Sequence, residues 1–237
     1  MTERGSAALA RTRDGLAIGP SSLRWRDGTL TISLDEVAVP WPRRVRGEIV
    51  LHAGPQPNRG FALDAAGRHR WQPIAPVARV EARFTAPALS WSGHGYCDTN
   101  DGDRPLADDF LAWDWSREGG SRSTRLLYDA VRRDGTTTAL ALALDHEGVL
   151  RDVEAPPLVG LKRSLWGIAG RTRSDPGQAP HLLRRLEDTP FYARSIVGTV
   201  WNGSPATLVH ESLSMTRFTH PVVQAMLPFR MPRWAGR

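Results

Sequence analysis

Apolar and polar residues alternate with a period of two along much of the chain. Residues 28–39 read GTLTISLDEVAV, which places Leu30, Ile32 and Leu34 on one face and polar side chains on the other. Residues 46–53 and 78–86 repeat the pattern, and stretches rich in Pro and Gly, such as GPQPNRG, separate them. These features predict a series of antiparallel strands joined by turns.

The second half of the chain continues the alternation. Two alternating runs within residues 123–145 meet at Asp134-Gly135, a dipeptide typical of tight hairpin turns, and therefore predict a β-hairpin. The pattern predicts further strands in residues 164–173, 193–203 and 205–218.

Two segments have helical character. Residues 179–190, APHLLRRLEDTP, are expected to form one helix, and residues 219–231 another, with Thr219 as the candidate N-cap and Pro228 as the residue that ends or kinks it.

The fold predicted from this pattern is all-β, with antiparallel, barrel-like sheets and a short C-terminal helix. REGGS, at residues 117–121, interrupts the alternation and places a division near residue 118. We expect residues 1–118 to form part of one β-barrel, which carries the candidate site, and residues 119–237 to form a second β-barrel that ends in the helix. An elongated apolar ligand would lie inside such a barrel.

Charge and cysteine content narrow the classes of function. The 31 basic and 25 acidic residues leave a net charge of +6, but Lys162 is the only lysine and the arginines are scattered, which favours codon usage over a nucleic-acid surface. Cys97 is the only cysteine, so an intrachain disulfide is excluded and a cytoplasmic location is expected. Apolar stretches of signal-peptide or membrane-spanning length are absent from the sequence.

The densest chemistry lies in WSGHGYCDTNDGDRPLADDFLAWDWSR, residues 91–117. In an extended segment, Tyr96, Asp98 and Asn100 share one face while Cys97 faces the other way. Two further same-face pairs follow from the alternation: His69 with Trp71, and Trp113 with Trp115.

A carboxyl group beside aromatic rings suits one kind of reaction. If Asp98 lies in a barrel interior, burial would raise its pKa and keep it protonated as a proton donor. Aromatic faces stabilise a developing carbocation through their quadrupoles. Together these groups would protonate an alkene.

Simpler interpretations apply to several neighbours. Trp113 and Trp115 suit core packing as well as ligand binding, and Cys97 suits a packed thiol. His94, between two glycines, is expected in a turn. A solvated loop is expected for the acidic residues Asp101, Asp103, Asp108 and Asp109, and the spacing of His69, His94 and Asp98 predicts no metal site.

Three segments together resemble the carotenoid 1,2-hydratase family, also called hydroxyneurosporene synthases, of purple phototrophic bacteria. They are RHRWQPIAP, the stretch 91–117 quoted above, and the C-terminal LPFRMPR. The resemblance covers most of residues 16–233. It implies a lipocalin-like (calycin) β-fold and a hydro-lyase that adds water to the terminal C1=C2 bond of acyclic carotenoids, such as neurosporene and lycopene, in carotenoid biosynthesis and without a cofactor.

The family's proposed active-site residues are a His-x-Trp pair followed by a Tyr-x-Asp pair. The matching positions here are His69 and Trp71, then Tyr96 and Asp98. The resemblance therefore implies catalytic roles for these four residues. Asp98 would be the acid, and Trp71 and Tyr96 would shield the cation. His69 would orient Asp98 or a water, and would accept the proton that this water loses when it attacks C1. The candidate substrate-binding residues are Trp91, Trp113 and Trp115.

Other interpretations of the same residues stay open. The chain would instead be a lipocalin-like carrier of a hydrophobic ligand, or an enzyme acting on another terpenoid or polyketide alkene. Members of the family carry a further stretch before the segment that resembles MTERG, so Met1 is either an internal methionine or the start of a shortened, inactive homologue. Residues 222–234 join apolar residues to Arg230 and Arg233, which suits either peripheral membrane contact or packing on the barrel.

Overall fold

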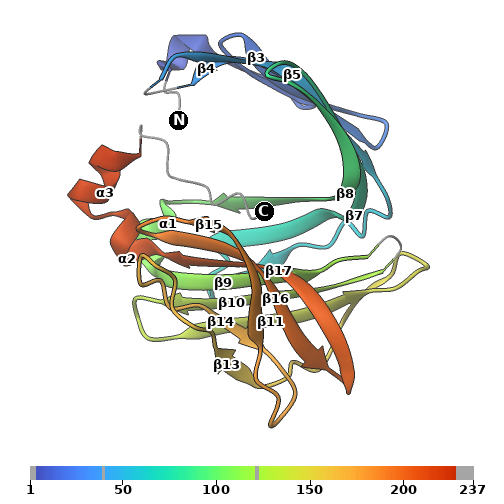
Figure 1. Ribbon diagram of the computed structural model, residues 1–237, viewed down its shortest axis with the longest axis vertical. Helices are drawn as coiled ribbons and strands as arrows, with labels where there is room; N and C mark the ends of the chain where they lie inside the picture. Colours follow the sequence, from blue (N-terminus) through green and yellow to red (C-terminus); the bar gives the residue numbers. More distant parts are fainter. Residues whose placement is uncertain (1–3, 39–40, 121–122, 228–237) are drawn as a thin grey trace.

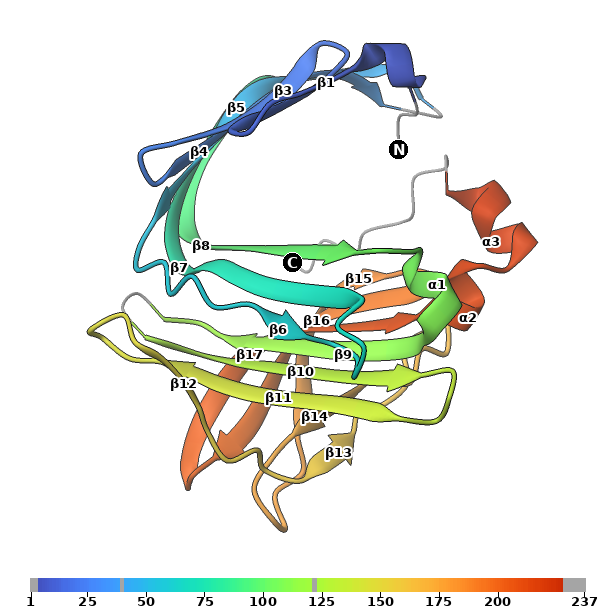
Figure 2. The same cartoon turned by 180° about the vertical axis from the view of Figure 1, so that it is seen from behind.

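Antiparallel β-sheet makes up most of the computed structural model, which describes residues 4–38, 41–120 and 123–227. A strongly curved first sheet arches over a second sheet, and the three short α-helices lie together at one side (Figure 1). The view from behind shows the same two layers (Figure 2).

The first sheet has eight strands. They are β1 (Leu9–Arg11), β2 (Gly15–Ile18), β3 (Ser21–Arg26), β4 (Thr29–Ala38), β5 (Arg43–Ala53), β6 (Phe61–Ala62), β7 (His69–Ala86) and β8 (Ala88–Gly102). Their spatial order is β1-β2-β3-β4-β5-β7-β6, and β8 pairs with β7. The strands predicted at residues 46–53 and 78–86 are thus confirmed. The strand predicted at residues 28–39 is confirmed over Thr29–Ala38, and residue 39 lies outside the described residues.

The second sheet has seven strands. They are β9 (Phe110–Glu118), β10 (Thr124–Arg132), β11 (Thr137–Leu144), β12 (Leu150–Asp152), β15 (His181–Asp188), β16 (Tyr192–Trp201) and β17 (Ser204–Ser214). Their order is β12-β11-β10-β9-β17-β16-β15, and the two-stranded ribbon of β13 (Leu158–Gly160) and β14 (Arg171–Arg173) lies apart from it. The division near residue 118 stays a prediction; β9, which ends there, pairs with β10 and β17.

The predicted antiparallel all-β class is confirmed. Closed barrels, however, are not formed by the described strands, because neither order returns to its first strand.

Four short helical segments complete the described chain: the 3₁₀ turn η1 (Ser6–Ala8), α1 (Leu106–Asp109), α2 (Met215–Phe218) and α3 (Pro221–Met226). The predicted C-terminal helix is confirmed in α3. Its N-cap is His220, whose ring accepts from the Val222 amide, and not Thr219, because Pro221 occupies the first helical position. Pro228 lies outside the described residues.

The other expected helix is wrong. Residues 181–188 form β15, the edge strand beside β16, with two register shifts. Backbone pairing with β16 outweighs the helical propensity of this leucine- and arginine-rich segment. In the strand, the side chain of Leu183 is 53% exposed.

The strand expected at residues 164–173 is wrong over most of its length, since only Arg171–Arg173 is extended. A turn at Ser164–Gly167, with Gly167 at a φ of +76°, occupies the rest. The hairpin at Asp134-Gly135 is confirmed: it joins β10 to β11, with Gly135 at a φ of +84°.

The long hairpin of β7 and β8 connects the two layers. Its pairing shifts register between Pro73 and Ala78, and such bulges bend strands sharply. Arg117 of β9 is buried there and donates to the carbonyls of Pro76 and Gly95, which satisfies backbone acceptors at the bend. Residues 78–95 therefore belong to the arch, while residues 96–102 lie over the second sheet.

A continuous apolar core joins the layers below the bend. It includes Trp71 and Leu63 from the first layer and Phe110, Leu126 and Leu142 from the second, each at most 1% exposed. Burial of large side chains from both sheets fixes the hairpin over β9 and β10.

Candidate functional site

A pocket of about 350 Å³ lies between the inner end of β8 and the second sheet. Nine side chains line it: Tyr96, Asp98, Asn100, Leu106, Trp113, Trp115, Tyr128, Arg194 and Glu211. Its size is at the lower end of the range for small-molecule pockets, and most of its wall is aromatic or apolar.

Strand β8 supplies one wall through simple alternation. Tyr96, Asp98 and Asn100 all face the pocket, so the predicted shared face is confirmed. Cys97 points to the other side, where it packs against a cluster that includes Leu51. Burial raises the pKa of its thiol, as expected for a packed cysteine.

The second sheet supplies the opposite wall as one row across four strands. Tyr128 pairs with Trp115, Trp115 with Glu211, and Glu211 with Arg194, in β10, β9, β17 and β16 respectively. Directly paired residues point to the same face of a sheet, so the row runs from an aromatic end to a charged end. Trp113 lies two residues before Trp115 and lines the same wall, which confirms their shared face.

Two donors bind one oxygen of Asp98. The indole Nε1–H of Trp71 donates to Oδ2 at 2.7 Å, and the hydroxyl of Tyr96 donates to the same atom at 3.0 Å. Oδ1 accepts no hydrogen bond from the described residues. Because the lone pairs of Oδ2 are engaged, a proton on this carboxyl group resides on Oδ1.

Aromatic rings surround this carboxyl group. The ring of Trp71 lies 5.2 Å from that of Tyr128, and the ring of Tyr96 lies 4.8 Å from that of Trp115. Burial, reinforced by the charge of Asp98, raises the pKa of Tyr96 well above its usual value. Tyr96 therefore stays a neutral phenol and remains a hydrogen-bond donor to Asp98.

His69 has another partner. Its side chain is fully buried, and its Nε2 lies 2.7 Å from Oδ2 of Asp109, which also accepts from Arg104. Arg104 first, and then His69, hold the pKa of Asp109 well below its usual range. His69 therefore binds Asp109 and not Asp98. The short helix α1, which ends at Asp109, places this residue beside the start of β7, where His69 lies.

The stretch 101–109 is only partly the solvated loop that was expected. Asp101 and Asp103 are exposed and form ion pairs with Arg70 at 2.8 and 3.6 Å. Asp109 departs from that expectation through its bonds to His69. His94 is also not in a turn, since it lies in β8 opposite Arg79.

Trp91 does not line the pocket with the other candidates. It lies opposite Ala82 in the arched half of β8 and is 49% exposed. Its predicted role in substrate binding stays a prediction.

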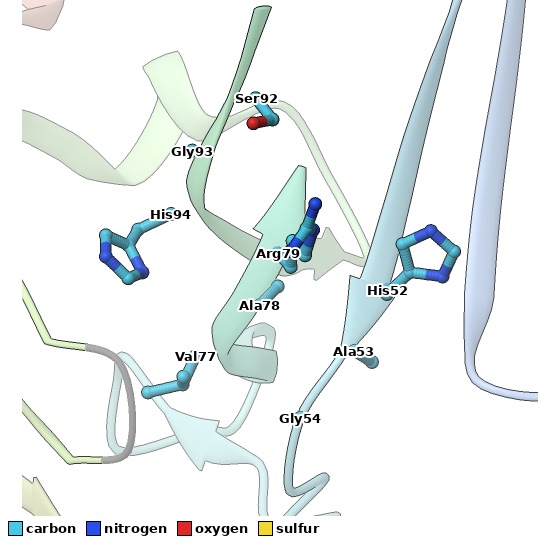
Figure 3. Close-up of a pocket in the computed structure, with 9 residues that line it drawn as sticks. All are labelled: His52, Ala53, Gly54, Val77, Ala78, Arg79, Ser92, Gly93 and His94. Atoms are coloured by element: carbon cyan, nitrogen blue, oxygen red, sulfur yellow. The ribbon is translucent and has the colours of Figure 1, made fainter. Parts of the chain in front are cut away.

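A second hollow, of about 400 Å³, opens in the arch where β5, β7 and β8 run side by side. Arg79 lies between His52 and His94, and in Figure 3 the two imidazole rings point away from one another. These three side chains do not converge on a common point, so the Asp98 pocket is the better candidate site.

Sequence reasoning missed several residues of the site. Glu211, Arg194, Tyr128 and Leu106 line the pocket, but each comes from a different element. Arg194 and Glu211 are 17 residues apart and meet only because β16 pairs with β17 in this register. A local motif would not have found them.

Metal-ligating clusters of three or more His, Cys, Asp or Glu are absent from the described part of the chain. Among the described residues, no helix combines the length and the apolar character needed to span a bilayer.

Comparison with known proteins places the chain among relatives of one kind. The family model "Carotenoid hydratase CrtC" matches residues 1–237. The chain is 49% identical to the acyclic carotenoid 1,2-hydratase of Thiocapsa roseopersicina over 237 residues and 42% identical to that of Rubrivivax gelatinosus over 236. It spans 58% of the length of each of these two relatives. It is also 39% identical to the enzyme of the same name from Rhodobacter capsulatus, of which it covers 84%.

Solved structures with a similar fold are more distant. The putative AttH of Nitrosomonas europaea matches with a TM-score of 0.57 at 12% identity, covering 88% of this chain and 72% of that one. Kievitone hydratase of Nectria haematococca matches with a TM-score of 0.55 at 10% identity, covering 84% and 70%. These two likenesses concern the fold alone. The match of the family model along residues 1–237, together with 39% identity to a relative of which the chain covers 84%, identifies the chain as a member of the carotenoid hydratase family.

Proposed function

We propose that this chain hydrates the terminal C1=C2 double bond of an acyclic carotenoid, such as neurosporene or lycopene, to a tertiary alcohol. This is hydro-lyase chemistry in carotenoid biosynthesis, and the proposal requires no cofactor. One observation carries it: in a member of the carotenoid hydratase family, Asp98 faces an aromatic pocket with one oxygen held by two donors and the other oxygen free to deliver a proton.

The first step is protonation. Oδ1 of Asp98 gives its proton to C2 of the terminal isopropylidene group, and the electron pair of the double bond forms the new C–H bond. The positive charge then resides on C1, because a tertiary cation is more stable than the secondary alternative. Trp71 and Tyr96 stabilise the resulting carboxylate through their hydrogen bonds to Oδ2.

The aromatic wall stabilises the cation. The rings of Tyr96, Trp113 and Trp115 line the pocket, and that of Trp71 lies behind Asp98. Each ring face contributes about 2 kcal/mol to the stability of a desolvated cation. A water bound in the pocket then adds to C1 and loses a proton.

His69 acts as a positioning residue in this account. Its bond to Asp109 anchors α1, whose Leu106 lines the pocket. A pocket of this size accommodates one end of a C40 hydrocarbon.

The solubility of the proposed substrate bears on where the chain acts in the cell. Acyclic carotenoids dissolve in lipid, and the proposal places the chain in the cytoplasm, in peripheral contact with the cytoplasmic or an intracytoplasmic membrane. Exposed apolar residues support such contact: Leu165 is 81% exposed, Trp166 44% and Val222 of α3 60%. Arg217 donates to the Trp166 carbonyl and so ties the turn of Leu165 to α2, which α3 follows.

Flotation with phosphatidylglycerol vesicles tests the membrane contact. A Leu165→Ser, Trp166→Ser variant should float less than the wild type, while Leu183→Ser, on the exposed edge strand β15, serves as the matched control. Equal flotation of the wild type and the double variant would remove this turn from the proposed contact.

Product analysis tests the proposed reaction. The purified chain is incubated under anaerobic conditions in H₂¹⁸O with neurosporene or lycopene, supplied in detergent or liposomes. The products are separated by chromatography and identified by mass spectrometry. We expect a tertiary alcohol that carries ¹⁸O. Tight binding of the carotenoid by folded protein without any product would support the carrier function instead.

A further inference from the structure

Asp98 accounts for the protonation of C2, but the addition of water to C1 also needs a base. When water adds to C1, its oxygen forms the C–O bond and one of its protons must leave. His69 was the candidate for this proton from the sequence, but its Nε2 is occupied by Asp109 and its side chain is fully buried. Another acceptor must therefore face the pocket.

We propose that Glu211 is this base and that Arg194 is its positioning residue, an inference that rests on the proposed hydration. Glu211 lines the same pocket as Asp98 and comes from the opposite wall. It lies in the paired row that includes Trp115 and Tyr128, one strand further from the aromatic end.

Both carboxyl groups line one pocket, together with Tyr128. The pocket thus has an acid on the wall of β8 and a second carboxylate on the wall of β17. Separation of two carboxyl groups across a reacting bond allows one to give a proton while the other takes one from water.

The contacts of Glu211 keep it fixed. Nε of Arg194 donates to Oε1 of Glu211 at 2.8 Å and to the hydroxyl of Tyr192 at 2.8 Å. The Glu211 side chain is 23% exposed, so its ion pair is partly shielded from solvent. This charged end, where Arg194 and Glu211 line the pocket, also offers polar groups that suit a bound water.

The proton balance of the full cycle is closed. Asp98 loses a proton to C2, and Glu211 gains one from the water that attacks C1. The net reaction consumes one alkene and one water, and proton exchange with solvent returns both carboxyl groups to their starting forms.

Azide separates the acid step from the water step, because azide attacks a cation without losing a proton. In Glu211→Ala, hydration should fall about 100-fold or more, whereas added azide should restore consumption of the carotenoid and give a product with azide at C1. Asp98→Asn should give neither product. Glu118→Ala is the matched control: Glu118 pairs with Arg125 on a neighbouring strand, lies outside the pocket and should leave hydration unchanged.

Each outcome is decisive. Hydration at the wild-type rate in Glu211→Ala would overturn the inference, and so would a folded Glu211→Ala that consumes no carotenoid with azide. Glu211→Gln, which keeps the shape of the side chain, should show the same loss of hydration and guards against misfolding of the alanine variant. A folded wild type that makes no alcohol would overturn the proposed hydration itself, and the inference with it.

Discussion

The indole of Trp71 and the carboxyl of Asp98 are joined by a 2.7 Å hydrogen bond from Nε1–H to Oδ2, although the two residues are 27 positions apart. The bond forms because β7 and β8 are paired antiparallel, with Trp71 opposite Asn100. This hydrogen bond links the His-x-Trp pair on β7 to the Tyr-x-Asp pair on β8. It engages Oδ2 of Asp98, so Oδ1 is the oxygen that acts on the substrate in the proposed reaction.

Trp71→Phe tests this bond. Phenylalanine keeps an aromatic ring but removes the donor, so the Asp98 carboxylate formed after proton transfer loses one of its two stabilising bonds. We expect kcat to fall about tenfold to a hundredfold, the equivalent of one hydrogen bond to a charged group. Trp201→Phe makes the same change at a residue that is equally buried in another cluster. It should lower the thermal midpoint of unfolding and leave kcat unchanged.

Asp109→Asn tests the positioning role of His69. The substitution removes the charge that Arg104 and His69 share, so α1 should pack less firmly beside the pocket. The thermal midpoint of unfolding should fall and KM should rise by about tenfold or less, with little change in kcat. Asp101→Asn, at an exposed ion pair with Arg70, should change none of these quantities. A large loss of kcat with unchanged KM would instead indicate that His69 takes part in the chemistry.

Gly95→Ala tests the close approach of β8 to β7 just before Tyr96. A Cβ atom at Gly95 would overlap a methyl group of Val80, whereas one at Gly93 would have nothing within 4 Å. We expect Gly95→Ala to lower the free energy of unfolding by about 1–3 kcal/mol and to reduce activity by displacing Tyr96. Gly93→Ala is the control, and equal effects of the two substitutions would contradict the packing described here.

His210 predicts acid sensitivity of the fold. Burial lowers the pKa of His210 to about 3, with the charge of Arg185 as a second cause, from a usual value of 6.5. Below pH 6.5 only the unfolded chain takes up this proton, so protonation favours unfolding as the pH falls towards 3. Between pH 6.5 and 5 the loss is about 2 kcal/mol of unfolding free energy.

Denaturant titrations at several pH values measure this loss. Asp114 lies 3.8 Å from His210 and burial raises its pKa, so its contribution has the opposite sign. The comparison of the wild type with His210→Gln therefore isolates the histidine. A wild type and variant with the same pH dependence would contradict the assignment.

The sequence predicts those parts of the site that depend on local geometry. Alternation along one strand is enough to place Tyr96 and Asp98 on one face and Cys97 on the other. The hairpin at Asp134-Gly135 is predicted for the same reason, since the turn residues themselves determine it.

Longer-range features were not predictable. Glu211 faces Asp98 only through the pairing of β9 with β17 and the position of the hairpin over that sheet, and register across a sheet is not visible in one strand. Local propensity predicts a helix at residues 181–188, but pairing with β16 outweighs this propensity and the segment forms the edge strand β15. The hydrogen bond between His69 and Asp109 depends on the bend of the chain at α1, and the pattern of apolar and polar residues does not predict this bend.

The hydration rate of Asp98→Asn tests the central claim most directly. Asparagine keeps the size of the side chain and an oxygen that accepts from Trp71 and Tyr96, but its amide is too weak an acid to protonate C2. We predict that the folded variant, checked by circular dichroism and its thermal midpoint, forms labelled alcohol from neurosporene about 10²- to 10⁴-fold more slowly than an active wild type. Hydration by the variant at the wild-type rate would contradict the assignment of Asp98 as the acid.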